Sequence, residues 1–145
     1  FALEAARHLV LFLKRSGDQR QFSTHLQAQF SDVPAIARVQ AWCLDHLDSD
    51  LRVAALAREA AMSERNFVRI FRKDTGQTPG EFVTTARFQA ACRMLEETER
   101  GIDEIAARCG FGGAAALRRA FRTRLQMNPT QYRDTFGAAS QLERE

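Results

Sequence analysis

The sequence predicts an all-α fold in which two helix-turn-helix units are joined by a long helix, and three observations lead to it. Between Leu51 and Phe136 the apolar residues recur at helical spacing, and no segment of useful length alternates as a half-buried strand does. Two short segments carry the residues that begin a helix. The pattern of the first unit also occurs a second time: Pro79 and Pro129 stand 129 − 79 = 50 positions apart, as do Phe71 and Phe121.

The composition is that of a folded, helix-rich domain with a short appendage. Of the 145 residues 45% are hydrophobic and 27% are charged, with only 3 prolines and 8 glycines. The net charge of +3 is compatible with a polyanionic partner but does not establish one. The most apolar stretch, residues 9–13, is far shorter than the roughly 20 residues that a bilayer requires. We therefore expect no membrane association.

The first thirty residues predict a separate segment. Apolar positions between Leu3 and Lys14 form a helical stripe, residues 16–19 break it, and residues 19–29 are polar. Since the chain opens at Phe1, directly in helical sequence, we interpret residues 1–30 as the end of an upstream domain plus a linker. The main domain is expected over residues 31–136, opening with the helix that follows Asp32-Val33-Pro34 and contains Ile36, Val39, Trp42, Cys43 and Leu47. Residues 137–145 are expected to be a tail.

Two helix starts are especially clear. Thr78-Pro79-Gly80-Glu81 and Asn128-Pro129-Thr130-Gln131 each offer an N-cap oxygen, a proline at the first helical position, and Glu or Gln three residues after the cap. The first of them predicts a continuous helix from about Pro79 to about Glu97, roughly 28 Å long. That length is close to the roughly 34 Å between successive major-groove openings on one face of DNA, so one chain can place two reading helices along a duplex.

The first unit, about residues 51–74, follows a helix-turn-helix pattern. Leu56, Ala57 and Ala60 form a short apolar face, residues 61–63 form the turn, and a second helix is expected to bury Phe67, Ile70 and Phe71. Small residues at 57, 60 and 61 should let the two helices cross closely, and Ser63 should cap the second one. Helical periodicity then turns a basic face outward, and a helix of this diameter fits the major groove. The residues of that face are Arg65, Val68, Arg69 and Arg72, followed by Lys73.

The second unit, about residues 102–126, repeats the design. Its first helix carries Ile105, Ala106 and Cys109, and its turn is Gly110-Phe111-Gly112. The register slips by one in this turn, since Leu56 and Ile105 stand 105 − 56 = 49 positions apart. Its second helix should bury an apolar stripe and expose a basic face. The expected stripe is Leu117, Ala120, Phe121 and Leu125, and the expected face is Arg118, Arg119 and Arg122.

The sequence offers no pattern for catalysis, a cofactor or a metal. The three histidines share no metal-ligand spacing, and no Ser, His and acid cluster surrounds a nucleophile turn. Residues 110–113 are glycine-rich but lack the strand and lysine of a nucleotide loop. The odd set Cys43, Cys92 and Cys109 lies in apolar helical patterns, which favours core thiols over a redox sensor and predicts a cytoplasmic protein. We therefore expect no enzyme.

The second half of the chain contains Ile105-Ala106 through Cys109-Gly110-Phe111, then Phe121-Arg122, and then Pro129 with Tyr132-Arg133. In these motifs and their spacing, residues from about 35 to 136 resemble the C-terminal domain of the AraC/XylS family of bacterial transcription regulators. The resemblance implies a homeodomain-like, AraC-type fold that binds double-stranded promoter DNA in successive major grooves, usually to activate a metabolic operon, with RNA polymerase as a further partner. Residues 6–10 and 22–23 resemble the junction found in members with a PfpI, amidotransferase-like sensor domain.

That second resemblance implies that a small-molecule effector acts only through the missing sensor domain. Because both DNA-reading units lie on one chain and no effector pocket is evident, the fragment is expected to be monomeric and to bind DNA constitutively, while the full-length protein can be dimeric. An alternative is that the basic faces contact an acidic protein, such as a polymerase subunit. The duplication argues for DNA, because repeated reading helices suit a repeating groove.

The resemblance also implies which positions read bases. They are Arg65, Val68 and Arg69 in the first unit, and Ala114, Ala115, Ala116 and Arg119 in the second. The chain departs from the family at Gly112-Gly113-Ala114-Ala115-Ala116, where serine and polar residues are common, and at Gln126-Met127, where a Gly-x pair is common. We therefore expect the first unit to set most of the sequence preference and the second to hold the DNA backbone, with the arginines at 118 and 122 on phosphates.

Overall fold

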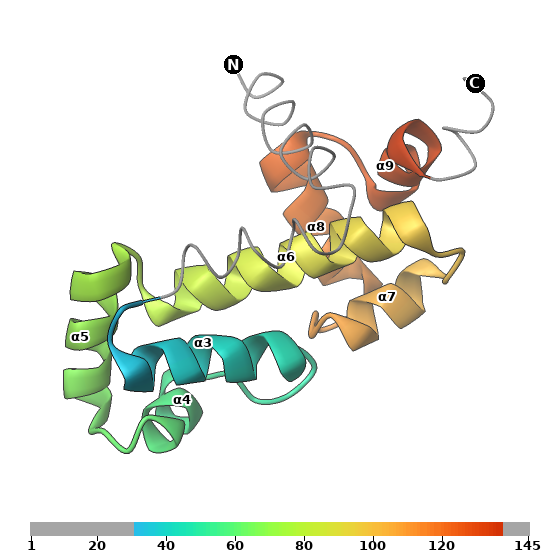
Figure 1. The fold of residues 1–145 in the computed structure, drawn as a ribbon. Helices are drawn as coiled ribbons and strands as arrows, with labels where there is room; N and C mark the ends of the chain where they lie inside the picture. Colours follow the sequence, from blue (N-terminus) through green and yellow to red (C-terminus); the bar gives the residue numbers. More distant parts are fainter. Residues whose placement is uncertain (1–30, 138–145) are drawn as a thin grey trace. The chain divides into compact units, whose positions relative to one another are not determined.

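The computed structural model describes residues 31–137, and every regular element in that range is an α-helix (Figure 1). The all-α prediction is therefore confirmed. The expected helix at residues 3–14, the linker and most of the predicted tail lie outside the described residues. The helices are α3 (Pro34–Asp45), α4 (Val53–Glu59), α5 (Glu64–Thr75), α6 (Pro79–Glu97), α7 (Ile102–Arg108), α8 (Ala114–Leu125) and α9 (Pro129–Phe136).

The described residues divide into two compact units, a first unit of residues 31–86 and a second unit of residues 87–137, each larger than the helix-turn-helix segment that it contains. The first contains α3, α4, α5 and the start of α6, and the second contains the rest of α6 with α7, α8 and α9. Each unit therefore holds one helix pair of the helix-turn-helix pattern. Among residues 31–137, no helix is both long and apolar enough to cross a membrane.

Both predicted helix starts have the expected hydrogen bonds. At α6 the Glu81 backbone N–H donates to Thr78 Oγ1 over 3.1 Å, and the Thr78 N–H donates to Glu81 Oε1 over 3.2 Å. At α9 the same reciprocal pair joins Asn128 and Gln131, at 2.8 and 2.9 Å. These capping boxes satisfy N–H groups that a helix leaves free at its beginning. The predicted continuous helix from Pro79 to Glu97 is confirmed with those bounds.

The first unit is built around the aromatic side of α5. Phe67 and Phe71 are 0% exposed, and their rings lie 5.6 Å apart. Phe82 of α6 contacts Phe71 edge to face at 5.7 Å. Ile70, predicted to be buried, is only partly so, and Leu47 lies beyond the end of α3 at Asp45. The remaining core residues are Ile36, Val39, Cys43, Leu51, Leu56, Ala57, Ala60 and Val83.

The second unit repeats this core. Phe121 of α8 is 0% exposed and contacts Tyr132 of α9 edge to face at 5.5 Å, and Phe88 of α6 lies 4.8 Å from Phe121. Since Phe121 and Tyr132 follow Phe71 and Phe82 by 50 positions, the sequence repeat is also a repeat of aromatic packing. Ala120, expected in the stripe, is only partly buried. Further core residues are Ala91, Cys92, Leu95, Ile105, Ala106, Cys109, Leu117 and Leu125.

The turn inside each helix-turn-helix pair has the same hydrogen bonds. In the first, the Met62 N–H donates to the Ala57 carbonyl and the Ala61 N–H to the Arg58 carbonyl, both over 3.0 Å. In the second, Phe111 and Gly110 donate to the carbonyls of residues 106 and 107 over 2.8 and 3.3 Å. This is the Schellman arrangement, which requires a left-handed residue after the helix. That residue is Ala61, with a φ of 56°, in one turn and Gly110, with a φ of 85°, in the other.

The exposure of Ala61 differs from the sequence prediction. Ala57 and Ala60 are buried, as close crossing of α4 and α5 requires, but Ala61 is exposed. Its left-handed backbone turns the chain out of α4, so its methyl group does not enter the crossing. Ala61 therefore serves to reverse the chain and takes no part in the helix contact.

Candidate nucleic-acid interface

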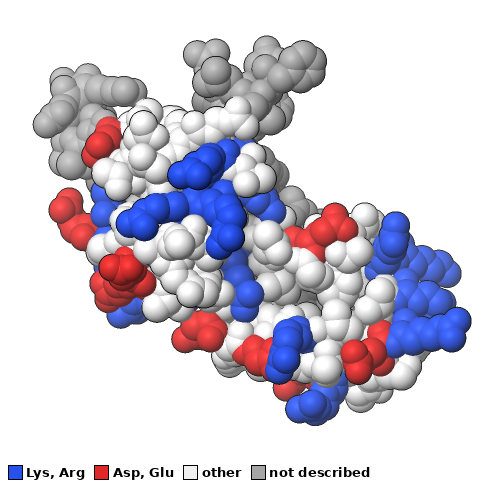
Figure 2. All heavy atoms as spheres, turned by 180° about the vertical axis from the view of Figure 1, so that it is seen from behind, with Lys and Arg blue, Asp and Glu red and all other residues white. Residues whose placement is uncertain are grey.

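Helix α5 presents a basic face because its other side is fixed in the core. Ser63 caps the helix by accepting a hydrogen bond from the Asn66 N–H over 3.2 Å, and Gly76 ends it with a φ of 77°. Between these ends Phe67 and Phe71 are buried, so residues on the opposite side reach solvent. Figure 2 shows basic side chains gathered over α5. The exposed members are Arg65, Arg69, Arg72 and Lys73.

The position of Val68 requires a correction. Helical periodicity predicted it on the outward face with the arginines, but it is only half exposed and packs against the core cluster of the first unit. The reason is its place on the helix: one residue after Phe67 and three before Phe71, it lies on the flank of the buried stripe. Its outer methyl surface still borders the basic face.

Helix α8 presents a second basic face by the same means. Leu117, Phe121 and Leu125 are buried, while the arginines one residue after Leu117 and one residue after Phe121 are exposed. Figure 2 also shows basic side chains gathered over this helix. The exposed arginines are Arg118, Arg119 and Arg122. At the start of α8, Ala115 is exposed, whereas Ala114 and Ala116 are half buried.

Among residues 31–137, the charges of these faces form no ion pairs. Ion pairs are found elsewhere, for example between Arg52 and Asp50 at 3.0 Å and from Glu104 to Arg100 and Arg108 at 2.7 and 3.2 Å. No carboxylate of the described residues pairs with the cations on the outward faces of α5 and α8. Free guanidinium groups can donate two parallel hydrogen bonds to a guanine edge or to a phosphate.

Two other arginines, Arg124 and Arg133, make contacts within the second unit. Arg124 of α8 places its guanidinium 5.1 Å from the centroid of the Phe88 ring, a cation–π contact. Arg133 of α9 donates from Nε to the Leu95 carbonyl over 3.3 Å and from Nη2 to the Arg100 carbonyl over 2.7 Å. It therefore satisfies carbonyl groups at and beyond the last turn of α6. Neither residue was among the predicted site residues.

The structure adds one residue that was not predicted from the sequence. The Arg69 Nη2 group donates a 2.7 Å hydrogen bond to Asn66 Oδ1 on the same face of α5. The separation of three residues, which brings side chains together on a helix, was the available signal.

The described residues show no group of three or more His, Cys, Asp or Glu side chains that could hold a metal ion. The cysteines Cys43, Cys92 and Cys109 are all buried, and none forms a disulfide. Burial raises the pKa of Cys109 to about 11 and raises that of Cys92 well above its ordinary value.

Two helix-turn-helix units with exposed basic second helices define the class of helix-turn-helix DNA-binding domains. A family model described as "Helix-turn-helix domain" matches residues 56–135. The chain belongs to the AraC/XylS-type helix-turn-helix family of DNA-binding domains. Because this is a family of transcription regulators, the chain is not an enzyme.

Known relatives share this domain. The chain is 48% identical over 85 residues to the HTH-type transcriptional regulator Rv1931c of Mycobacterium tuberculosis, covering 59% of this chain and 33% of that protein. It is 32% identical over 93 residues to the regulatory protein SoxS of Escherichia coli K12, covering 64% of this chain and 87% of SoxS. The chain thus spans about a third of the length of Rv1931c.

Among solved structures, the DNA-binding domain of AdpA, a global transcriptional factor crystallised with a target DNA, matches with a TM-score of 0.66 and 42% identity. The match covers 74% of this chain and 94% of the AdpA chain. An AraC-type regulator from Chromobacterium violaceum has a TM-score of 0.65 at 20% identity and supports the fold alone.

Proposed function

We propose that this domain binds double-stranded promoter DNA in a sequence-dependent way, with α5 and α8 in successive major grooves. The observation that carries the proposal is that each second helix exposes a row of arginines with no ion-pair partner among residues 31–137. The similarity to the DNA-binding domain of AdpA, which was crystallised with a target DNA, supports the same function.

We propose a division of roles among the predicted residues. Arg65 and Arg69, with the outer surface of Val68, read base edges in the first groove, because guanidinium groups match guanine and a methyl group matches thymine. In the second groove Arg119 reads a base beside the methyl groups of Ala114 and Ala115. The remaining side chains, Arg72, Lys73, Arg118 and Arg122, hold phosphates and supply affinity without sequence information.

The proposal is tested by selecting bound duplexes from a random pool and then titrating the selected duplex against this chain at graded salt. The logarithm of the binding constant should fall linearly with the logarithm of the salt concentration, with a slope of about −0.9 for each phosphate contact. The selected duplex should bind much more tightly than a scrambled one. Equal affinity for both duplexes would overturn sequence-dependent binding. A complex with an acidic protein but not with DNA would favour the alternative partner.

We further propose that the chain binds DNA as a monomer and without a small molecule, because both reading helices belong to one chain. The stoichiometry of the titration, checked by light scattering of the complex, tests this: an obligatory pair of chains on one site contradicts it. In the full-length protein we propose an upstream PfpI-type sensor domain that carries the effector site, and activation of a metabolic operon in the cytoplasm through RNA polymerase. The sequence resemblance of residues 6–10 and 22–23 and the family's usual mode support these last proposals.

A further inference from the structure

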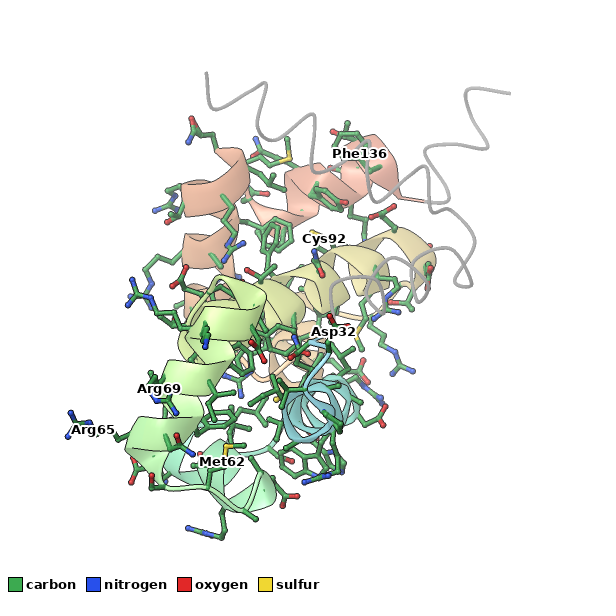
Figure 3. All side chains as sticks on the ribbon, turned by 60° about the vertical axis from the view of Figure 1, so that its left-hand side comes forward. Asp32, Met62, Arg65, Arg69, Cys92 and Phe136 are labelled. Atoms are coloured by element: carbon green, nitrogen blue, oxygen red, sulfur yellow. The ribbon has the colours of Figure 1, made fainter. Side chains whose placement is uncertain are left out.

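The hydrogen bond between Asn66 and Arg69 lies on the outward face of α5. The amide oxygen of Asn66 accepts from Arg69 Nη2 over 2.7 Å, and the Asn66 backbone N–H is itself held by the Ser63 cap over 3.2 Å. Asn66 is half buried, whereas Arg69 is exposed. In Figure 3 both Arg65 and Arg69 lie on the outer side of α5, and Arg65 extends away from the helix into solvent. Arg65 has no hydrogen bond to another side chain of the described residues.

We propose that Asn66 is a positioning residue that holds the Arg69 guanidinium in one orientation for reading a base edge. This inference rests on the proposed function and names a determinant of its specificity. A free arginine side chain occupies many rotamers and must be immobilised when it binds a base. Because Asn66 already holds one N–H group of the Arg69 guanidinium, the remaining N–H groups of that guanidinium point in a defined direction. The side chain therefore loses less conformational entropy when it binds a base.

The second unit supplies an internal comparison. Ala116 is the third residue of α8 and Asn66 the third residue of α5, and each precedes an exposed arginine by three positions. The two differ by 116 − 66 = 50 positions, the register of the repeat. A methyl group cannot accept a hydrogen bond, so Ala116 does not hold the Arg119 guanidinium as Asn66 holds that of Arg69. Among residues 31–137, one reading arginine therefore has an acceptor three residues before it, and the other does not.

The difference predicts that the two units discriminate unequally. Immobilising a rotamer-rich side chain in advance changes binding by about 2- to 10-fold. Asn66 should therefore contribute about that factor to discrimination at the base pair read by Arg69. It should contribute little to affinity for scrambled DNA, where no base edge matches the held guanidinium.

The experiment measures affinities of the 145-residue chain for the selected duplex, for every single-base variant of it, and for a scrambled duplex. Five proteins are compared: wild type, Asn66→Ala, Arg69→Ala, the double variant, and Asn66→Asp. Arg69→Ala first identifies the base pair that Arg69 reads. Asn66→Ala should then lower discrimination by about 2- to 10-fold at that base pair alone, and should have no further effect when Arg69 is already alanine.

The variant Asn66→Asp separates positioning from direct reading. Its carboxylate still accepts from Arg69, so discrimination at the Arg69 base pair should return, although the added negative charge weakens binding to all duplexes. An asparagine that read adenine itself would instead change preference at a different base pair. That result, an additive effect in the double variant, or unchanged discrimination in Asn66→Ala would each overturn the inference.

A gain-of-function variant keeps the inference testable if Asn66→Ala folds poorly. Ala116→Asn places the acceptor three residues before Arg119 and should raise discrimination at the base pair read by Arg119 by a similar factor. No gain in a folded Ala116→Asn protein counts against the inference. Wild-type binding without sequence dependence would overturn the proposed function itself, whereas wild-type discrimination that both variants leave unchanged would overturn only the role of Asn66.

Discussion

The Tyr132 hydroxyl donates a 2.6 Å hydrogen bond to the carboxylate of Glu96, and so ties α9 to the last part of α6. At the equivalent position of the first unit stands Phe82, which has the same edge-to-face contact but no hydroxyl group. Both units therefore share the aromatic contact, and the second unit has in addition a hydrogen bond from the tyrosine hydroxyl. Burial, and then the charges and hydrogen bonds around it, raise the pKa of Tyr132 and keep its hydroxyl protonated as a donor.

Replacing this hydroxyl should weaken the second unit while leaving its packing intact. We expect Tyr132→Phe to lose about 1–2 kcal/mol of unfolding free energy, because the bond goes to a charged but only half-buried group. Urea denaturation measures the loss. Since a raised tyrosine pKa affects stability only as pH rises above about 10, the loss should be constant between about pH 6 and 9. An equal loss in Tyr132→Phe whether or not Glu96 is replaced by Ala, which has no acceptor, would contradict the assigned partner.

The aromatic residues of the second helices should be structural. Phe71 and Phe121 are 0% exposed, so we expect Phe71→Ala and Phe121→Ala each to cost about 3–5 kcal/mol. Phe111, half buried in the turn before α8, is the matched control and should cost less. Thermal and urea unfolding give the comparison. An unchanged melting temperature for Phe71→Ala would place that residue outside the core.

Two left-handed positions occupied by residues other than glycine should be sites of stabilisation. Ala61 and Gln126 have φ values of 56° and 57°, whereas their counterparts Gly110 and Gly76 have 85° and 77°. A side chain in this region costs about 1–2 kcal/mol, and glycine's greater freedom in the unfolded chain offsets part of that. We expect Ala61→Gly and Gln126→Gly each to add about 0.5–1 kcal/mol to the unfolding free energy.

The matched control for these changes is Gly76→Ala. A Cβ at Gly76 would meet no atom within 4 Å, so the substitution tests the backbone conformation alone. It should lower the unfolding free energy by about 1 kcal/mol. If Gly76→Ala were neutral, the left-handed backbone would not be the source of the expected gains at Ala61 and Gln126.

Replacing an arginine that reads a base edge should affect DNA binding differently from replacing one that holds a phosphate. We expect Arg69→Ala to cost about 1–3 kcal/mol of binding and to relax preference at one base pair. Arg122→Ala should weaken binding to all duplexes alike and reduce the salt slope by about one. Both are measured against single-base variants of the selected duplex. A uniform loss for Arg69→Ala, together with lost discrimination at one position for Arg122→Ala, would reverse the assigned roles.

The buried cysteines should be unreactive in the folded protein. The reacting species is the thiolate, and burial raises the pKa of Cys109 to about 11, so little thiolate forms at neutral pH. We expect Cys43, Cys92 and Cys109 to react with an aromatic disulfide reagent only as fast as the protein unfolds. The rate should rise with urea in parallel with unfolding. Rapid labelling of one thiol in the native state would reopen the redox-sensor alternative.

Much of the fold could be predicted from the sequence because its determinants are local. The capping boxes at Thr78 and Asn128 involve residues three positions apart, and the starts of α6 and α9 follow from them. The burial of the phenylalanines at 67, 71 and 121 follows from helical periodicity. Because the pattern occurs twice in the sequence, each copy supports the interpretation of the other. The exposed arginines were then predictable as the residues opposite the core.

The tertiary structure determined the burial of side chains at the edge of the apolar stripes and the contacts of the long arginine side chains. Val68 lies at the edge of the stripe, so only the packing of neighbouring helices determined that it is half buried. Arginines look alike in a sequence, yet Arg124 lies over a ring and Arg133 on carbonyl groups of another segment. Their long side chains reach partners far away along the chain, and periodicity within one helix does not specify those partners. Burial of the apolar stripe was therefore determined by the sequence pattern, and the division of the arginines between structure and free surface by the packing of the helices around them.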